Sequence, residues 1–271
     1  MSFYREYFKK TNKEATEYKI EYLKSVIIDN KIYKFILFNE NQHLNDLKIS
    51  AFENEMLWFS YYKFLNDNTE FEIKYDVNEI SKRTNKSPKF INFIYKTMTE
   101  VYDICSFSYE YHDYMWTEYA NSGNGICLVF NISDLDMLFP IDYVRKDTIN
   151  FTELIIQSLN NSVRGIDYNE PMGLLPFVVK NPYNGKLDSS LEKEVRILYS
   201  PFDNEECNDG IVLPNIKTDI GHKGINVGYA DVGVSLNRII LGNKCEHNII
   251  DTIQSWAKKN NMQLLYYEYK G

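Results

Sequence analysis

The sequence predicts an α+β domain in which strands form most of the core. Residues 125–131 are a continuous apolar run, which is typical of a strand buried on both faces. Residues 192–199 alternate charged and apolar side chains, which is the pattern of a half-buried strand. Residues 1–30 instead place aromatic and aliphatic side chains at helical spacing. This mixture predicts strands at the centre with helices packed around them.

The N-terminal half of the chain alternates helical and strand patterns. Tyr18 and Tyr22 fall on one face of the amphipathic first segment. The run Ile32–Phe38 is aromatic and β-branched and predicts a strand, and Pro88 marks a helix start within the helical pattern of residues 76–100. The other elements expected here are a helix over residues 42–53, strands over Met56–Ser60 and Cys105–Ser108, and a short helix over Tyr114–Tyr119.

The C-terminal half predicts further strands and two longer helices. Gly123 and Gly125 supply a turn before the buried strand. After that strand we expect a short strand over 142–144, a helix over 148–165, strands over 192–199 and 234–241, a helix over 247–260 and a closing strand over 263–269. No internal repeat or low-complexity linker interrupts the chain, so we predict a helical extension over residues 1–30 and a single α+β domain over residues 31–271.

Composition narrows the function classes. The chain has a formal net charge of −8, and an acidic surface opposes non-specific binding to nucleic acid. Its four cysteines form no CxxC pair, which argues against a zinc ribbon or a redox motif. The N-terminus has no apolar signal core, and no stretch reaches about 18 apolar residues, so no membrane partner is expected. These observations predict a cytoplasmic protein.

Two serines are the first candidate site residues. Ser106 and Ser108 share one strand face, because strand side chains alternate with a period of two. Two hydroxyls on one face can hold a polar ligand or orient a catalytic carboxylate. The alternative is a pair of exposed strand serines without a role in binding.

Two carboxylates are the second candidate. Glu192 and Glu194 lie about 7 Å apart on one strand face or on the loop entering it, and Arg196 continues that face. One such carboxylate can orient a substrate while the other stabilises developing positive charge. The alternative is an exposed, salt-bridged edge strand, which contributes little stability. A metal nuclease site built from Asp103 and both glutamates is disfavoured by the lack of a suitably spaced lysine, so no metal is expected.

An aromatic cluster follows the serine strand. Tyr111, Tyr114, Trp116 and Tyr119 can form a stacking wall for a flat ring, and the alternative is an aromatic helix face that packs into the core. His112, the histidine nearest to this cluster, is either a general base or a solvated loop residue.

Several segments together resemble a bacterial family, the domain of unknown function 2971. The resemblance covers about Tyr33 to the C-terminus. Its most specific part is CSFSYEYHDYMWTEYANSGNGICLVF, in which a CxS strand precedes MWxxYA, a glycine and a buried strand. The other segments that carry it are YKFILFNEN, LWFSYYKFLND, EKEVRI and RIILG. Members often occur near phage-defence or abortive-infection genes, so the resemblance implies a role in phage defence or in a toxin system.

The order of the segments is also similar to that of the ADP-ribosyltransferase toxins of the Arg–Ser–Glu class. This similarity implies an ADP-ribosyltransferase-like split sheet and NAD as co-substrate. Ser106 would orient the catalytic Glu194, which would stabilise the oxocarbenium-like ribose as nicotinamide leaves, and Glu192 would help to position the acceptor. The residues implied to bind NAD are Lys34, Ser108, Trp116 and Tyr119.

One position departs from this pattern. Ile36 stands where related sequences tend to have an arginine, and an aliphatic side chain cannot hold the NAD pyrophosphate. Either Lys34 or another cation substitutes, or activity is lost. The leading hypothesis is an NAD-dependent ADP-ribosyltransferase-like effector that modifies a protein or a nucleic acid. The alternative is a non-catalytic sensor that keeps the fold and binds a nucleotide, a phage protein or an antitoxin.

Overall fold

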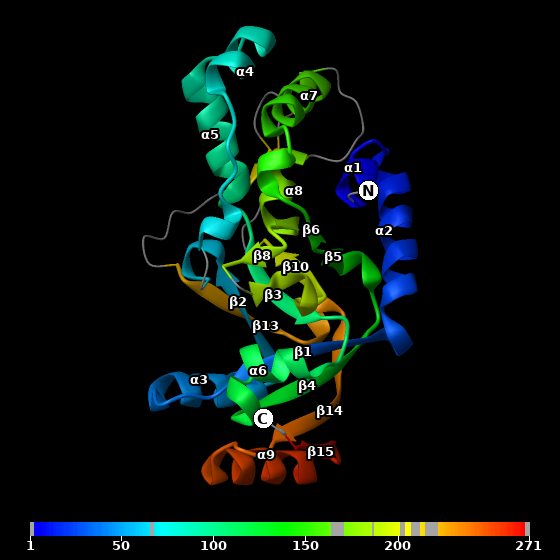
Figure 1. The fold of residues 1–271 in the computed structure, drawn as a ribbon, viewed down its shortest axis with the longest axis vertical. Helices are drawn as coiled ribbons and strands as arrows, with labels where there is room; N and C mark the ends of the chain where they lie inside the picture. Colours follow the sequence, from blue (N-terminus) through cyan, green and yellow to red (C-terminus); the bar gives the residue numbers. More distant parts are fainter. Residues whose placement is uncertain are drawn as a thin grey trace.

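A nine-stranded mixed sheet lies at the centre of the molecule (Figure 1). The computed structural model describes residues 3–65, 68–163, 171–185, 187–200, 204–206, 212–214 and 222–268. Seven strands follow one another in the order β13 (Gly224–Gly228), β2 (Met56–Tyr61), β3 (Asp103–Ser108), β1 (Lys31–Leu37), β4 (Gly125–Ile132), β14 (Val234–Gly242) and β15 (Gln263–Tyr267). The other two are β10 (Glu194–Tyr199) and β5 (Leu138–Pro140). Within the described part of this sheet, β14 and β15 are parallel and the other pairs are antiparallel.

The sheet divides at β3. Strand β10 pairs with β3 along its whole length, from Glu194 opposite Ser108 to Tyr199 opposite Asp103. Two strands divide the other edge of β3 between them: β2 pairs with it at Ile104, and β1 pairs with it at Ser108. Two branches, β2–β13 and β1–β4–β14–β15, thus leave the same edge, and the serine-bearing strand lies at their junction.

Strand β4 is the buried centre of the longer branch, as its apolar run predicts. It pairs with β1 on one edge and with β14 on the other. Its side chains alternate between two cores, with Leu128 and Phe130 on one face and Cys127 and Val129 on the other. A strand that is apolar at every position therefore serves both faces of the sheet.

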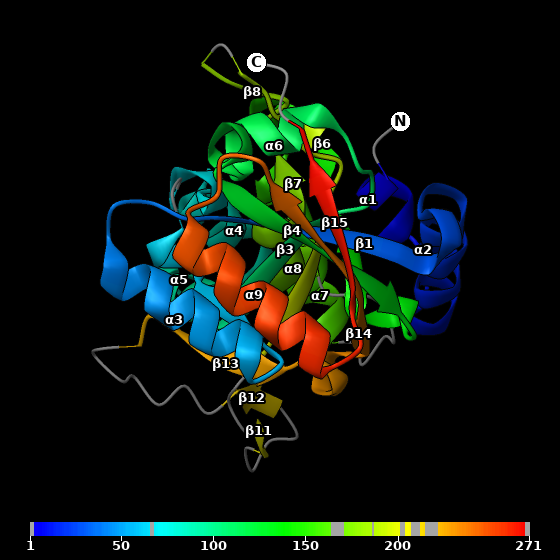
Figure 2. The same ribbon diagram turned by 90° about the horizontal axis from the view of Figure 1, so that it is seen from below.

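Helices cover the two faces of this branch differently. Helices α3 (Gln42–Glu53) and α9 (His247–Lys259) lie side by side over one face (Figure 2), where the rings of Phe52 and Trp256 pack with their centroids 4.6 Å apart. Helix α6 (Asp113–Tyr119) covers part of the other face, where Trp116 packs edge-on against Phe35 of β1. The face under α6 carries both sites described below.

The N-terminal helices α1 (Phe3–Tyr7) and α2 (Asn12–Val26) pack onto the rest of the molecule. Thr11 and Glu14 form a capping box at the start of α2. The buried Lys19 ammonium pairs with Asp136 at 2.8 Å, and the Tyr4 hydroxyl donates to the Pro140 carbonyl at 2.8 Å. The predicted helical extension therefore makes polar contacts with the segment that contains β5.

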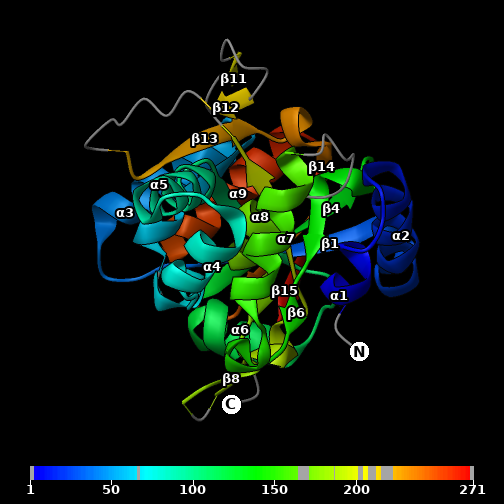
Figure 3. The same cartoon turned by 90° about the horizontal axis from the view of Figure 1, so that it is seen from above.

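A group of helices forms the end of the molecule opposite α9 (Figures 1 and 3). It contains α4 (Val77–Thr84), α5 (Pro88–Thr99), α7 (Phe151–Val163) and α8 (Pro171–Val178). Ile80, Ile91 and Ile155 pack together between three of them. The remaining strands form short pairs, β6 (Asp142–Tyr143) with β7 (Val179–Lys180), β8 (Tyr183–Asn184) with β9 (Leu187–Asp188), and β11 (Asn204–Glu206) with β12 (Val212–Pro214).

The structure confirms an α+β domain with a mixed, largely antiparallel sheet and flanking helices. Some predicted boundaries were wrong. The strand expected over 192–199 begins at Glu194, because Glu192 ends a 3₁₀ turn over Ser189–Glu192. The helix expected from residue 148 begins at Phe151, and its predicted end at 164–165 falls outside the described residues, as does Tyr269. No helix in the described parts is both long and apolar enough to cross a membrane.

Candidate functional site

Pairing of β3 with β10 brings Ser106 and Glu194 together. The register places Arg196 opposite Ser106 and Glu194 opposite Ser108, so these four side chains lie on one face of the sheet. Val195 points to the other face, into the core. The Ser106 hydroxyl donates a hydrogen bond to the Glu194 carboxylate. The strand alternation inferred from the sequence therefore produces a contact between the two residues.

Glu192 reaches the same place from a different local structure. It ends a 3₁₀ turn, and Lys193, between the two glutamates, has left-handed backbone angles of φ 50° and ψ 47°. Such angles are uncommon for residues other than glycine and mark a sharp change of direction. The Nζ of Lys180 lies 2.6 Å from Glu192 Oε2 and 3.3 Å from Glu194 Oε2. Both carboxylates therefore face one ammonium group.

Arg196 closes the inner side of the site. Its Nε donates to Glu194 Oε1 at 2.6 Å, and its other nitrogens donate to Glu70 and to the main-chain carbonyl of Phe177. Glu70 also lies 3.5 Å from Lys180 Nζ. Arg196 is only 2% exposed, so its charge is compensated by protein groups and not by water. We call Glu70, Lys180, Glu192, Glu194 and Arg196 the charge cluster.

Sequence reasoning missed Lys180, Glu70 and Tyr143. Lys180 ends β7, Glu70 lies in a 3₁₀ turn over Asn68–Phe71, and the Tyr143 hydroxyl accepts a hydrogen bond of 3.0 Å from the Glu194 amide. None of the three stands in a motif or a periodic pattern that distinguishes it from a surface residue. Their role follows from tertiary contacts alone.

The surroundings give the two carboxylates different acidities. Burial alone would raise the pKa of Glu194, but the charges of Arg196 and Lys180 and hydrogen bonds from Arg196 and Ser106 outweigh it and hold this pKa well below its usual range. For Glu192, burial and repulsion by Glu194 prevail over Lys180 and raise the pKa to about 7. Three carboxylates face two cations, so a proton on Glu192 makes the charge cluster neutral. Its loss leaves one negative charge in excess.

Tyr119 forms the accessible edge of the site. Its hydroxyl is hydrogen-bonded to the Glu192 carboxylate, and its side chain is 36% exposed. Burial and the nearby negative charges of Glu192 and Glu194 raise the pKa of this phenol, so it stays protonated and donates to Glu192. Of the aromatic residues predicted to bind a ring, Tyr119 is thus placed beside the carboxylates.

Lys34, predicted to bind the cofactor, lies on the other face of the sheet. Its Nζ donates to the main-chain carbonyl of Ser106 at 2.8 Å, while its side chain lies over the ring of Phe107. Phe107 alternates with Ser106 along β3 and therefore points away from the carboxylates. The structure does not bring the Lys34 ammonium to them, and the cations at the site are Lys180 and Arg196.

Trp116 and Ser108 make packing and main-chain contacts. Trp116 is fully buried, stacks on Tyr267 with centroids 4.3 Å apart and donates to the Tyr111 hydroxyl at 3.1 Å. Ser108 is 1% exposed, and its hydroxyl is within hydrogen-bonding distance of the carbonyls of Glu110 and Glu192. The Ser108 contacts hold the turn that carries Glu192 against β3. The structure thus gives both residues protein partners where the resemblance implies NAD.

Asp103, considered above as a third carboxylate, lies at the far end of β3 from Ser108. It pairs with His222 at 2.7 Å and is not a neighbour of the charge cluster. Among the residues that the structure describes, no group of three histidine, cysteine or acidic side chains is arranged to hold a metal ion.

The site thus joins an ionised, buried carboxylate, a second carboxylate that exchanges a proton near neutral pH, and a phenol at the surface.

Comparison with known proteins finds no matching family model, no similar curated protein and no similar solved structure, so the family resemblance stays a prediction.

Proposed function

We propose that this protein cleaves the N-glycosidic bond of NAD and transfers ADP-ribose to an acceptor, in phage defence or in a toxin system. One observation carries the proposal: Glu192 and Glu194 face a common cation, and their surroundings separate their pKa values. Carboxylate pairs with separated pKa values are typical of glycosidic-bond chemistry, in which one group stays ionised and the other exchanges a proton.

The charges of the site suit each part of this reaction. When the bond between nicotinamide and ribose breaks, the bonding electrons leave with nicotinamide and positive charge develops on the ribose. Glu194 is ionised and fixed, so it stabilises that charge without rearrangement. Glu192, once deprotonated, can take the proton of the acceptor while the acceptor bonds to the ribose carbon.

A non-catalytic binding role is the alternative, and two observations favour it. Both oxygens of Glu194 contact cations, Oε1 the buried Arg196 and Oε2 the partly buried Lys180. Ile36, at the position where the resemblance calls for arginine, packs against the core of the opposite face. A carboxylate occupied in this way can serve to hold β10 in place, with the fold acting as a binding module.

The decisive experiment measures nicotinamide release and transfer of label from NAD that is labelled in its adenylate part, with cell lysate as the source of acceptor. We expect both activities from the natural chain. The Glu194→Gln variant, which removes the charge and keeps the shape, should lose roughly 100-fold or more of the release rate. Glu118→Gln, an exposed glutamate on α6, is the matched control and should retain activity.

Two results would decide against catalysis. The first is the absence of nicotinamide release from the natural chain with lysate present. The second is release that persists unchanged in Glu194→Gln, with folding of that variant verified by circular dichroism. Saturable binding of NAD without turnover would support the binding role.

A further inference from the structure

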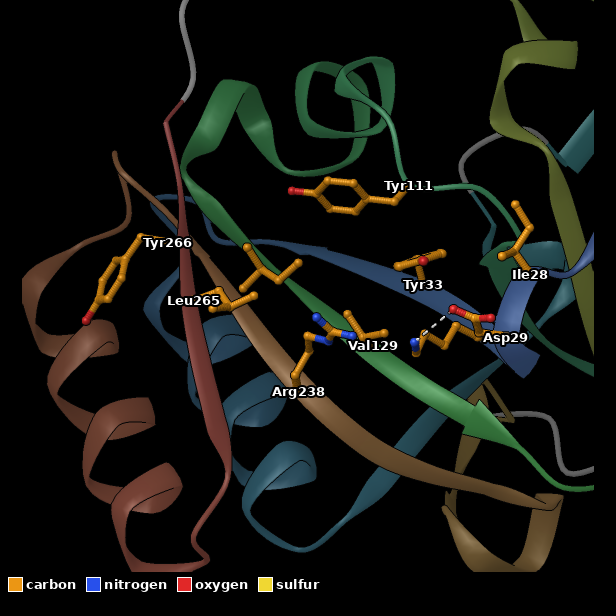
Figure 4. A pocket seen from close by; sticks show the side chains of 10 residues that line it. Ile28, Asp29, Tyr33, Tyr111, Val129, Arg238, Leu265 and Tyr266 are labelled. Carbon is orange, nitrogen blue, oxygen red and sulfur yellow. Dashed lines mark hydrogen bonds and ion pairs between the residues drawn. The ribbon is translucent and has the colours of Figure 1, made fainter.

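A second site lies on the same face of the sheet as the charge cluster, beyond the loop that leads into α6. It is a cavity of about 300 Å³, a size at the lower end of small-molecule pockets. Its floor comes from β4, β14 and β15, with Val129, Ile240 and Leu265, and its sides come from β1 and the loop before α6. Figure 4 shows the Arg238 side chain lying across this floor, with Tyr111 opposite it and Tyr33 to one side.

A β-bulge places Arg238 in this cavity. The register of β14 against β4 shifts between Leu236, opposite Phe130, and Arg238, opposite Val129, so Asn237 is an extra residue. Before the bulge, Leu236 packs into the core under α9; after it, Arg238 and Ile240 point to the opposite face. Bulges often re-aim a side chain beside a functional site. Arg238 opens RIILG, one of the segments that carry the family resemblance.

Arg238 forms a hydrogen bond but no ion pair with the part of the chain that the structure describes. Its Nε donates to the Asn237 side chain at 3.1 Å, and no carboxylate within the described ranges lies at ion-pairing distance from it. Lys31, at the rim, pairs with Asp29 at 3.4 Å. An arginine over an apolar floor, in a chain of net charge −8, presents guanidinium N–H donors suited to a phosphate.

Aromatic side chains form the other half of the cavity. The rings of Tyr33 and Tyr111 contact each other, with centroids 5.6 Å apart and planes tilted by 49°, so together they form one aromatic wall. The Tyr111 hydroxyl accepts the hydrogen bond of the buried Trp116 indole at 3.1 Å, so this ring is held in place before any ligand binds. Tyr266, 60% exposed, lies at the opening. Fixed tyrosines of this kind stack on flat rings.

We propose that this cavity binds a mononucleotide, with its phosphate on the Arg238 guanidinium and its base against Tyr33 and Tyr111. The size of the cavity, the cation that has no ion pair among the described residues and the preformed aromatic wall all fit a flat ring joined to a phosphate. None of the lining residues belongs to the charge cluster, so the proposed binding site does not depend on the proposed transferase activity.

Calorimetric titration of the full chain tests the proposal, with adenosine 5′-monophosphate, guanosine 5′-monophosphate, adenosine and inorganic phosphate as probes. We expect at least one monophosphate to bind saturably and at least 10-fold more tightly than adenosine or phosphate. Arg238→Gln should weaken that binding at least 10-fold, and Tyr111→Leu should weaken it several-fold. Arg5→Gln, an exposed arginine on α1, is the matched control and should bind like the natural chain.

Three outcomes would overturn the proposal: no saturable binding of any monophosphate, equal affinity for adenosine and its monophosphate, or monophosphate binding that Arg238→Gln leaves unchanged. Thermal unfolding of each variant without ligand separates a lost contact from a lost fold. An effect of Tyr111→Leu on affinity without a change in thermal stability would confirm direct contact with the base.

Discussion

Arg196 and Arg238 lie on the same face of one sheet, yet they meet opposite surroundings. Arg196 is almost fully buried, and its guanidinium contacts two carboxylates and a carbonyl. Arg238 is half-buried over apolar side chains and contacts only an amide side chain among the described residues. The first charge is satisfied by the protein itself. The second has no ion pair among the described residues, and we propose that a bound phosphate provides one.

From this difference we infer different roles for the two charges. In the charge cluster, three carboxylates share two cations, so the net charge depends on whether one proton is bound, mainly at Glu192. In the Arg238 cavity, the proposed ligand brings a whole anion to the guanidinium. Chemistry with protons is expected at the first site and ligand capture at the second, and substitutions at the two arginines should distinguish them.

The largest expected effect is at Arg196. Arg196→Gln leaves Glu194 and Glu70 without their buried counter-charge, and the free energy of unfolding should fall by about 3–5 kcal/mol, as for other broken buried pairs. Chemical denaturation at pH 7 measures this change. Adding Glu70→Gln should recover part of the loss. The matched control is Arg83→Gln, which breaks an exposed pair with Glu153 and should have little effect.

If Arg196→Gln were as mild as Arg83→Gln, the charge cluster would not be a buried ionic network, and the separation of the two glutamate pKa values would lose its cause.

The next effect concerns pH. The pKa of Glu192 is raised in the folded chain to about 7, so protonation of Glu192 contributes stability that is fully present below its unfolded pKa and lost as pH rises through 7. Between pH 4.5 and 7.5, the natural chain should therefore lose stability relative to Glu192→Gln, by an amount on the order of 3 kcal/mol. Denaturation curves of both proteins across this range give the difference directly. Parallel pH profiles would show that Glu192 titrates as an ordinary carboxyl.

The smallest effect is at Arg238. Because no carboxylate of the described chain depends on this guanidinium, Arg238→Gln should change the free energy of unfolding by no more than about 0.5 kcal/mol in either direction. Thermal and chemical denaturation check this value. A loss as large as that expected for Arg196→Gln would mean that Arg238 stabilises the fold. Its position in the cavity would then be explained without a ligand.

The sequence predicted the elements well where one local signal dominates. The apolar run of β4, the alternation of β10 and the periodicity of α9 each describe the side chains of a single element, and each element is present. Boundaries failed where a turn overrides the pattern. The expected strand alternation at Glu192 is replaced by a 3₁₀ turn and a left-handed Lys193, for which the sequence has no glycine or asparagine signal.

The candidate site was predictable only in part. Period-two alternation correctly placed Ser106 with Ser108 on one strand face and Glu194 with Arg196 on another, and the pairing of β3 with β10 joins the two faces. It could not show that Lys34 occupies the other face, because that depends on how β1 aligns beside β3. Lys180 lies on a separate short strand 12 residues before Glu192, and a contact across that turn leaves no periodic pattern in the sequence. The bulge at Asn237 likewise became visible only in the pairing of β14 with β4.

The order of the strands also has a consequence for how the chain reaches its native state. Strands β1, β4 and β14 are neighbours in space, although about a hundred residues separate each from the next in the sequence. Pairings between such distant segments form slowly, because long loops must close before any contact is gained. Until β14 arrives, β4 has one unpaired edge made of apolar residues, which is prone to join other chains. The cavity around Arg238 is therefore expected to be among the last features to form during folding, and the β4 edge is where a stalled folding intermediate would aggregate.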